Sequence, residues 1–326
     1  MNIAVLGAGH IAGKMSRTLR LMAEKGADVT LYAAASRNLE KAQDFAREHG
    51  YQKAYGSYEE MLADPQVDLV YVATPHSHHG QHMEMCIAHG KHVLCEKAFT
   101  GNAHQARRVL TMAREKGVLA AEAIWTRYMP SRQIISDILA SGEIGEVRTV
   151  TASLCYDIID RPRLHLPELA GGALLDLGVY VLNLAAMTLG SDWTQAQGHV
   201  VLTDTGVDAG ENITLTYADD RRAHLIADAT YHSDRRAVIY GSKGYLTLDN
   251  VVNPRVMNLY DLWDTHIRTV AAPEQLTGYE YEVEACLRAI AAGQTEVPEM
   301  PHTEILRIME TMDDLRSQWG VRYPFD

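Results

Sequence analysis

Residues 2–13 read NIAVLGAGHIAG, and the interpretation of the whole chain starts from this segment. An apolar run over residues 3–6 predicts a buried strand, and helical character begins directly after the glycines. Gly7, Gly9 and Ala12 fill the three small-residue places of the G-x-G-x-x-A turn. In this turn the first glycine permits a tight bend, the second lets a pyrophosphate approach the backbone, and the third residue allows close helix packing. The segment predicts a dinucleotide-binding turn at a helix N-terminus, although a plain strand–helix turn has the same pattern.

Strand and helix patterns alternate along roughly the first 120 residues. Strands are expected at residues 29–35, 51–55, 68–73, 92–95 and 118–121. Alternation of this kind implies right-handed crossovers and a parallel sheet. We therefore expect residues 1–122 to form an NAD(P)-binding Rossmann domain with a doubly wound parallel sheet.

The pattern changes in the second part of the chain. Between residues 196 and 270, successive strands are separated by turn signals, which predicts a large, mostly antiparallel open sheet. Helices are expected near residues 172–189, 279–292 and 303–318. The predicted fold class is thus α/β, with the Rossmann domain followed by an α+β domain over residues 123–326 for substrate binding and oligomerisation. The closing helices could pack back on the first domain.

Composition narrows the possible partners and the compartment. The chain has 326 residues, a formal net charge of −12 and four cysteines without metal-ligand spacing. The negative net charge, with no block of basic residues, argues against a nucleic-acid partner. No apolar run is expected to be long enough to span a membrane. The cysteines predict reduced thiols, and a strand that begins at residue 2 leaves no room for a signal peptide, so we expect a cytoplasmic protein.

The end of the second strand bears on the choice of cofactor. NAD-binding domains usually place a carboxylate there to accept hydrogen bonds from the ribose hydroxyls. This chain has Ser36 and Arg37 instead, and a hydroxyl and a guanidinium could bind a 2′-phosphate. We therefore expect NADP, with NAD as the second possibility. The alternative is that Arg37 is only a solvated residue at the start of the next helix.

Several motifs together resemble the Gfo/Idh/MocA oxidoreductase family. They are Gly7-Ala8-Gly9-His10-Ile11-Ala12, then Ala73-Thr74-Pro75, then Cys95-Glu96-Lys97. The segment AGGALLDLGVY, residues 170–180, is similar to the family's substrate-side motif. With EAIWTR, residues 122–127, it is closest to the branch of dimeric dihydrodiol dehydrogenase and NADP-dependent D-xylose dehydrogenase. The resemblance covers essentially the whole chain.

The resemblance implies two overlapping sets of contact residues. Cofactor contacts are expected from Gly7, Gly9, His10, Ile11, Ala12, Ser36, Arg37, Thr74, Pro75, His76, His79, Glu96, Lys97, Trp125 and Arg127. Substrate contacts are expected from Lys97, Trp125, Arg127, Asp176, Tyr180 and Asn183. The chain departs from the family at Ala98, where proline is usual, at His76, where asparagine is frequent, and at Asn183, where aspartate is frequent.

Lys97 follows a strand of the predicted parallel sheet, so it should emerge at the carboxyl edge, where ligands bind. Glu96 could orient Lys97 or the nicotinamide ribose. The alternatives are a snorkelling surface lysine and an ordinary carboxylate at a strand end. Trp125 and Arg127 could wall the cleft and bind substrate oxygens, or they could serve interdomain packing.

Asp176, Tyr180 and Asn183 have the spacing i, i+4, i+7, which places them on one face of a helix. This polar stripe on an apolar helix predicts a catalytic face, and the alternative is a buried hydrogen-bond network. A tyrosine has an unperturbed pKa of about 10, and a neighbouring Lys97 ammonium would lower it. We therefore expect Tyr180 to exchange the proton of the substrate hydroxyl, and Asp176 to hold a second hydroxyl.

The histidines at positions 76, 78, 79 and 82 raise the question of a metal site. Nothing else completes a zinc-ligand pattern, and hydride transfer with lysine and tyrosine needs no metal. No metal is therefore expected, and His79 is expected at the start of a helix near the cofactor.

The leading hypothesis is an NADP-dependent oxidoreductase that acts on a sugar, a polyol or a cyclic vicinal diol. Some relatives cleave glycosides through transient oxidation by bound NAD, and others bind nucleotide and regulate a partner without catalysis. A homodimer or homotetramer that pairs through the second domain's sheet is expected, because an uncovered sheet face needs a partner.

Overall fold

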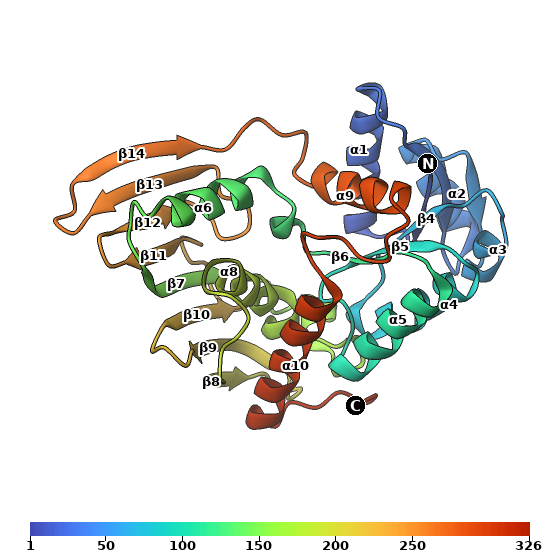
Figure 1. Cartoon of the computed structure of the whole chain (residues 1–326). Helices are drawn as coiled ribbons and strands as arrows, with labels where there is room; N and C mark the ends of the chain where they lie inside the picture. The colour runs from blue at the N-terminus through green and yellow to red at the C-terminus, as the bar shows by residue number, and fades with distance from the viewer. The chain divides into compact units, whose positions relative to one another are not determined.

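The computed structural model describes residues 1–326, and the chain divides into two units (Figure 1). The first unit comprises residues 1–125 and 275–306, and the second comprises residues 126–274 and 307–326. The division falls inside α10 (His302–Trp319), so this helix contributes residues to both units. Each unit is thus built from two stretches of chain that are distant in the sequence.

The first unit contains a six-stranded parallel sheet in the order β3-β2-β1-β4-β5-β6. The strands are β1 (Asn2–Leu6), β2 (Thr30–Ala35), β3 (Lys53–Tyr55), β4 (Leu69–Val72), β5 (His92–Glu96) and β6 (Ala120–Ala123). The central strands β1 and β4 are apolar and buried, as expected for a sheet covered on both faces. This order confirms the predicted doubly wound sheet, and the direction of winding reverses between β1 and β4.

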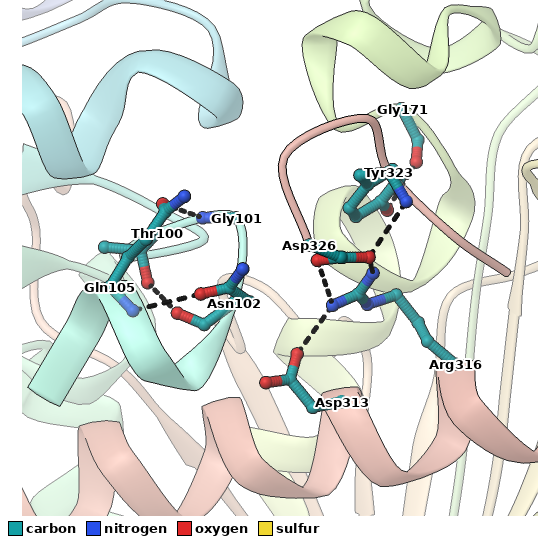
Figure 2. Close-up of polar contacts among 9 residues, drawn as sticks. All are labelled: Thr100, Gly101, Asn102, Gln105, Gly171, Asp313, Arg316, Tyr323 and Asp326. Atoms are coloured by element: carbon teal, nitrogen blue, oxygen red, sulfur yellow. Dashed lines mark hydrogen bonds and ion pairs between the residues drawn. The ribbon is translucent and has the colours of Figure 1, made fainter.

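Helices connect these strands: α1 (His10–Glu24), α2 (Leu39–His49), α3 (Tyr58–Leu62), α4 (His76–Ala88) and α5 (Ala103–Lys116). Polar side chains cap three of them, because a cap satisfies an N–H group that has no partner within the helix. At α5, Asn102 Oδ1 accepts a hydrogen bond from the Gln105 N–H at 3.0 Å (Figure 2). The Thr100 hydroxyl donates to the Asn102 carbonyl at 2.7 Å and closes the turn that precedes the helix.

A segment from late in the sequence completes the first unit. Helix α9 (Glu280–Ala291) packs on α1 and β5. The Glu280 carboxylate accepts hydrogen bonds from the N–H groups of Leu276, Thr277 and Gly278, which fixes the loop that enters α9. The hydroxyls of Thr277 and Thr18 lie 2.8 Å apart and join this loop to α1.

The second unit contains an eight-stranded sheet in the order β14-β13-β12-β11-β7-β10-β9-β8. The strands are β7 (Val147–Cys155), β8 (Gln195–Leu202), β9 (Asp208–Thr216), β10 (Arg222–Asp228), β11 (Ala237–Gly241), β12 (Gly244–Leu248), β13 (Val256–Asp261) and β14 (His266–Ala271). All neighbours are antiparallel except β7 and β10, which are parallel. The predicted mostly antiparallel sheet is confirmed.

Helices α6 (Pro130–Ser141), α7 (Pro162–His165) and α8 (Val179–Leu189) belong to the second unit. Helix α8 packs on β7 and β10, against the apolar face of the sheet. Residues 167–189 are long and apolar enough to cross a membrane by length and composition alone, but most of them are buried inside the protein. The segment is therefore a core element of the second unit.

One expected helix differs from the prediction. Residues 172–189 do not form one α-helix, because residues Leu174–Gly178 are π-helical and α8 begins only at Val179. Asp208 Oδ2 accepts a hydrogen bond from the Leu174 N–H at 2.5 Å and fixes the first residue of the π-helical segment. Gly178 faces Glu211 so closely that a Cβ would lie 2.8 Å from Glu211 Oε1. These strand residues lie against the helix and favour its wider turn.

Candidate functional site

The turn after β1 has the backbone that a dinucleotide-binding turn requires. Gly7 has a positive φ of 104°, and a Cβ at this position would lie 2.8 Å from the Ala73 carbonyl oxygen. Only glycine combines this φ with so close an approach. Ala12 is fully buried, so its small side chain lets α1 lie close to the sheet. The structural roles predicted for these two positions are confirmed.

Gly9, unlike Gly7, is not in close contact with the rest of the protein, and its backbone faces open space. It is exposed, and no atom lies within 4 Å of the position that a Cβ would take. It is the N-cap of α1, no side chain caps this helix, and the first turn carries no acidic residue. The N–H groups from His10 to Ala12 therefore present a positive helix end beside an uncovered backbone. These features fit the pyrophosphate of a dinucleotide.

Ser36 and Arg37 follow β2 at the carboxyl edge of the same sheet. Ser36 is buried, and its hydroxyl oxygen accepts a hydrogen bond from the Asn38 N–H, with N and Oγ 3.4 Å apart. The Arg37 side chain is exposed. Burial, and then the Arg37 charge, hold the pKa of His78 below its usual range. The Arg37 guanidinium therefore lies near the His78 ring. The connection between β2 and α2, residues 36–38, contains no carboxylate.

His79 connects the loops that follow β4 and β5. Its ring is fully buried, with Nδ1 2.8 Å from the Ala98 carbonyl oxygen and Nε2 2.8 Å from the Thr74 carbonyl oxygen. Burial lowers the pKa of His79 to about 4 although both carbonyls favour the charged form. The imidazole is thus neutral near pH 7 and donates to only one carbonyl at a time. His79 lies in the first turns of α4, as predicted.

The other loop histidines have partners of their own. His82 Nδ1 lies 3.0 Å from the Thr74 hydroxyl, and the His82 ring meets the Tyr58 ring edge-on at 4.9 Å. His76 is buried, and Pro75 precedes it as the exposed N-cap of α4. No group of three or more histidine, cysteine or carboxylate side chains is arranged to hold a metal ion.

Glu96 is the last residue of β5, and Lys97 follows it at the carboxyl edge of the sheet. The Tyr71 hydroxyl donates a hydrogen bond to Glu96 Oε1, and both side chains are buried. Burial, and then the Glu96 charge, raise the pKa of Tyr71, which keeps it a hydrogen-bond donor. Lys97 is half-buried, and its peptide bond to Ala98 is cis. Gly9 after β1 and Lys97 after β5 thus lie on one edge of one sheet.

Trp125 closes the first unit by packing on the loop before α9. Its ring stacks on the Tyr279 ring with centroids 4.5 Å apart and an interplanar angle of 14°. A Cβ on Gly278 would lie 2.6 Å from the Trp125 ring, so glycine is needed beneath it. Tyr279 was not predicted from the sequence, because it lies far from every recognised motif.

In the second unit, Arg127 and Asn183 bind each other. Arg127 Nε donates to Asn183 Oδ1 at 2.7 Å, and Asn183 Nδ2 donates to the Val179 carbonyl at 2.7 Å. Both side chains are buried. The amide group of Asn183 is thus fixed by protein partners on both of its polar atoms, and its binding to substrate stays a prediction.

Asp176 and Tyr180 lie on consecutive parts of the helix in the second unit. Asp176 belongs to the π-helical segment, and its side chain is only 5% exposed. Its carboxylate forms an ion pair with Arg163, with Nη1 2.6 Å from Oδ1. Tyr180 lies in the first turn of α8 and is half-buried. Arg163 could not be predicted from the sequence, since no motif surrounds it and its contact with Asp176 depends on the fold of α7.

Comparison with known proteins identifies the two parts of the chain. Residues 1–123 match the oxidoreductase family described as having an NAD-binding Rossmann fold, and residues 133–247 match the GFO/IDH/MocA C-terminal domain. The trans-1,2-dihydrobenzene-1,2-diol dehydrogenase of Danio rerio is 32% identical over 99% of this chain and 98% of its own length. The human enzyme of the same name is 29% identical over the same shares.

Solved structures show the same fold. A 3-ketoreductase from Actinomadura kijaniata, in complex with NADP and TDP-benzene, has a TM-score of 0.86 and 27% identity, covering 97% of both chains. Levoglucosan dehydrogenase, in complex with NADH and levoglucosan, has a TM-score of 0.87 over 98% of this chain and 97% of its own. At 17% identity, the second likeness concerns the fold alone.

Proposed function

The chain belongs to the Gfo/Idh/MocA oxidoreductase family, and on that premise we propose that it is an NADP-dependent dehydrogenase or reductase of a sugar, a polyol or a cyclic vicinal diol. Its assignment as an NAD(P)-dependent oxidoreductase follows from the family. The substrate class is supported by the names of relatives, which are a dihydrobenzenediol dehydrogenase and a 3-ketoreductase. In this proposal residues 1–122 bind the cofactor, and residues 123–326 bind the substrate.

The observation that carries the proposal is the shared edge of Gly9 and Lys97. The phosphate turn follows β1 at the carboxyl edge of the sheet, and Lys97 follows β5 at the same edge, with only β4 between the two strands. A dinucleotide whose pyrophosphate lies at Gly9 crosses this edge, where ligands of doubly wound sheets bind. Lys97 is then within the reach of the nicotinamide half.

NADP is proposed over NAD because of the residues after β2. Arg37 is an exposed guanidinium, which can form two parallel hydrogen bonds to a phosphate. None of the three residues between β2 and α2, Ser36, Arg37 and Asn38, is a carboxylate that could accept from a free ribose hydroxyl or repel a 2′-phosphate. A strong preference for NADH over NADPH in steady-state turnover would contradict this part of the proposal.

For the chemistry, we assign the proton to Tyr180 and the electrostatic support to Lys97. The bound nicotinamide supplies or accepts the hydride. The Tyr180 phenolate takes the substrate proton in oxidation, and the Tyr180 hydroxyl so formed returns it in reduction. The Lys97 ammonium favours the phenolate form during this exchange. Asp176, held by Arg163, accepts a hydrogen bond from a second substrate hydroxyl and so orients the reacting carbon.

The test is a substrate panel followed by NADPH absorbance. Sugars, polyols, vicinal diols and dicarbonyls are offered with each cofactor, and turnover of at least one class with NADPH or NADP is expected. Tight NADP binding without turnover on any of these substrates would contradict the proposal and indicate a regulator. Product formed from a glycoside, with the cofactor retained and unchanged overall, would indicate transient oxidation instead.

We also propose that the protein is a cytoplasmic homodimer, or a dimer of dimers, formed through the second unit's sheet. Three tyrosines lie on neighbouring strands, on the face opposite the buried Ile239 and Leu246: the Tyr245 ring stacks on the Tyr260 ring, and the Tyr240 ring is tilted against the Tyr245 ring. A patch of aromatic rings at a sheet face is typical of an interface. All four cysteines are free thiols, which suits a reducing compartment. Light scattering at micromolar concentration that finds only monomers would contradict the dimer.

A further inference from the structure

The segment 320–326 follows α10 and reaches the loop that precedes the π-helical segment (Figure 2). The Tyr323 hydroxyl donates a hydrogen bond to the Gly171 carbonyl at 2.7 Å, and the Tyr323 side chain is 4% exposed. Burial raises the pKa of Tyr323 well above its usual range, so the hydroxyl keeps its proton and donates. The proposed chemistry makes no use of this tyrosine.

Tyr323 is held firmly by its own surroundings. The Arg316 guanidinium lies 4.4 Å over the Tyr323 ring and donates to Asp326 Oδ2 at 2.8 Å. The Tyr323 N–H donates to the same Asp326 oxygen at 2.9 Å, and Arg316 also donates to Asp313 Oδ1 at 2.7 Å. Figure 2 shows these four side chains converging on the segment. The hydroxyl of Tyr323 therefore has a fixed position.

Gly171 contacts α7, the helix that carries the ion-pair partner of Asp176. A Cβ on Gly171 would lie 2.6 Å from the Leu164 carbonyl oxygen, and the neighbouring Gly172 N–H donates to that same carbonyl at 2.8 Å. Leu164 belongs to α7, and the preceding residue in this helix is Arg163, the ion-pair partner of Asp176. The loop at Gly171 therefore sets the position of α7.

The other side of the loop is fixed as well. Asp208 Oδ2 accepts from the Leu174 N–H, where the π-helical segment begins. A Cβ on Gly172 would collide with the Asp208 carboxylate, so the loop and β9 touch directly. The loop is thus anchored to β9 through Asp208 and to the 320–326 segment through Tyr323. Loss of either anchor lets α7 and its arginine move relative to Asp176.

We propose that Tyr323 is a positioning residue for the Arg163–Asp176 pair, through its hydrogen bond to Gly171. The inference rests on the proposed function, in which Asp176 orients the substrate by a second hydroxyl. The 320–326 segment then determines substrate affinity without touching the substrate. Binding of the dinucleotide does not depend on it, because the phosphate turn belongs to the other unit.

The structure offers a matched control at the far end of α8. The Tyr217 hydroxyl donates to the Gly190 carbonyl at 2.8 Å, and Tyr217 is 2% exposed. Gly190 is the C-cap of α8, so this bond has the same donor and acceptor groups as the Tyr323 bond, is partly buried, and lies at the end of the helix away from Asp176 and Tyr180. Tyr323→Phe keeps the ring beneath Arg316 and beside Phe325, with ring centroids 5.5 Å apart. Both Phe variants are therefore expected to fold.

The experiment measures KM and kcat of the full chain for the best substrate of the panel, together with thermal unfolding. Tyr323→Phe is expected to raise the substrate KM roughly tenfold with the NADP KM unchanged, since small misplacements of orienting groups are costly. Both variants should lower the melting temperature to a similar extent, because each loses one hydrogen bond. Tyr217→Phe should leave the substrate KM near the wild-type value. Equal effects of the two variants on the substrate KM would overturn the inference.

A double-mutant cycle separates positioning from general loosening. In an Asp176→Asn background, Tyr323→Phe should raise the substrate KM little further, because the group it positions is gone. If Tyr323→Phe raises the substrate KM by the same factor in the wild-type and the Asp176→Asn backgrounds, the inference is overturned and the proposed function stays intact. If Asp176→Asn alone leaves the substrate KM unchanged, the role of Asp176 in the proposed function is wrong, and the positioning role falls with it.

Discussion

His79 illustrates how burial competes with hydrogen bonding at a single side chain. Both of its ring nitrogens face carbonyl oxygens, an arrangement that would suit a doubly protonated ring. Complete burial outweighs this and lowers its pKa to about 4. The neutral ring joins the Thr74 and Ala98 loops, and the second of these loops carries Lys97. His79 thus helps to fix the loop that carries Lys97.

The lowered pKa of His79 predicts a loss of stability in acid. Above pH 6.5 the ring is neutral in both the folded and the unfolded chain, so it contributes no pH dependence. As the pH falls from 6.5 towards 4, the unfolded chain binds a proton that the folded chain does not, and the free energy of unfolding decreases. Urea unfolding at pH 7 and pH 4.5 measures this decrease.

The variant His79→Gln isolates the contribution, because glutamine can donate to one of the two carbonyls but does not titrate. Its free energy of unfolding should fall by roughly 2 kcal/mol less than that of the wild type between the two pH values. The pKa of His82 is also lowered to about 4, by burial first and to a smaller extent by His78 and His79, so most of its contribution is common to both proteins. Identical decreases in both proteins would show that His79 is not buried in its neutral form.

Arg37 carries the proposed choice of NADP. Because its side chain is exposed, Arg37→Ala should leave thermal stability unchanged and weaken NADP binding roughly 10- to 100-fold, the loss of a charge-assisted contact. NAD binding should change little. Arg47→Ala is the matched control, since Arg47 is an exposed arginine in the last turn of α2, paired with Asp44. Isothermal titration that finds the same NADP affinity for both variants would contradict the assignment.

The turn between β1 and α1 contains two glycines with different roles: Gly7 is required by the backbone structure, and Gly9 is proposed to contact the cofactor. Gly7→Ala should destabilise the protein even without cofactor, because its φ is positive and the Ala73 carbonyl is in the way. Gly9→Ala should leave the melting temperature of the cofactor-free protein unchanged, since nothing occupies the space around its Cβ position. It should still weaken NADP binding about tenfold or more, because the methyl group takes the place of the pyrophosphate. Unchanged NADP affinity in Gly9→Ala would contradict this placement.

Strands and helices could largely be predicted from the sequence, since apolar periodicity and glycine turns determine them locally. The residues 118–121 expected as a strand are shifted to Ala120–Ala123, because short apolar runs define strand ends poorly. The π-helical turn at Leu174–Gly178 could not be predicted. It depends on contacts with Asp208 and Glu211, which follow it in the sequence by many residues.

The candidate site shows the same limit. The phosphate turn, Lys97 and the Asp176–Tyr180 stripe could be identified because each lies in a continuous motif. Partners that come from elsewhere in the chain could not, and Arg163, Tyr279 and Tyr323 are of this kind. Their contacts are made by folding, with no local pattern to indicate them.

The two units of the molecule divide the proposed chemistry between them. Lys97 belongs to the first unit, together with the phosphate turn, and Tyr180 belongs to the second, together with Asp176. The proposed mechanism requires both side chains to act on one substrate beside one nicotinamide. This requirement is the central claim, and it concerns the whole chain rather than either unit.

The most direct test is the turnover number of the double variant Lys97→Met/Tyr180→Phe, compared with those of the two single variants. Tyr180→Phe keeps the ring and deletes the proton-carrying oxygen, so turnover should fall roughly 10²–10⁴-fold while NADP affinity stays within a few-fold. Lys97→Met should also remove most of the turnover. Residues that act as one catalytic group are non-additive, so the double variant should be little slower than the slower single variant. Near-normal turnover in folded Tyr180→Phe, or a double variant slowed by the product of the two single effects, would contradict the account.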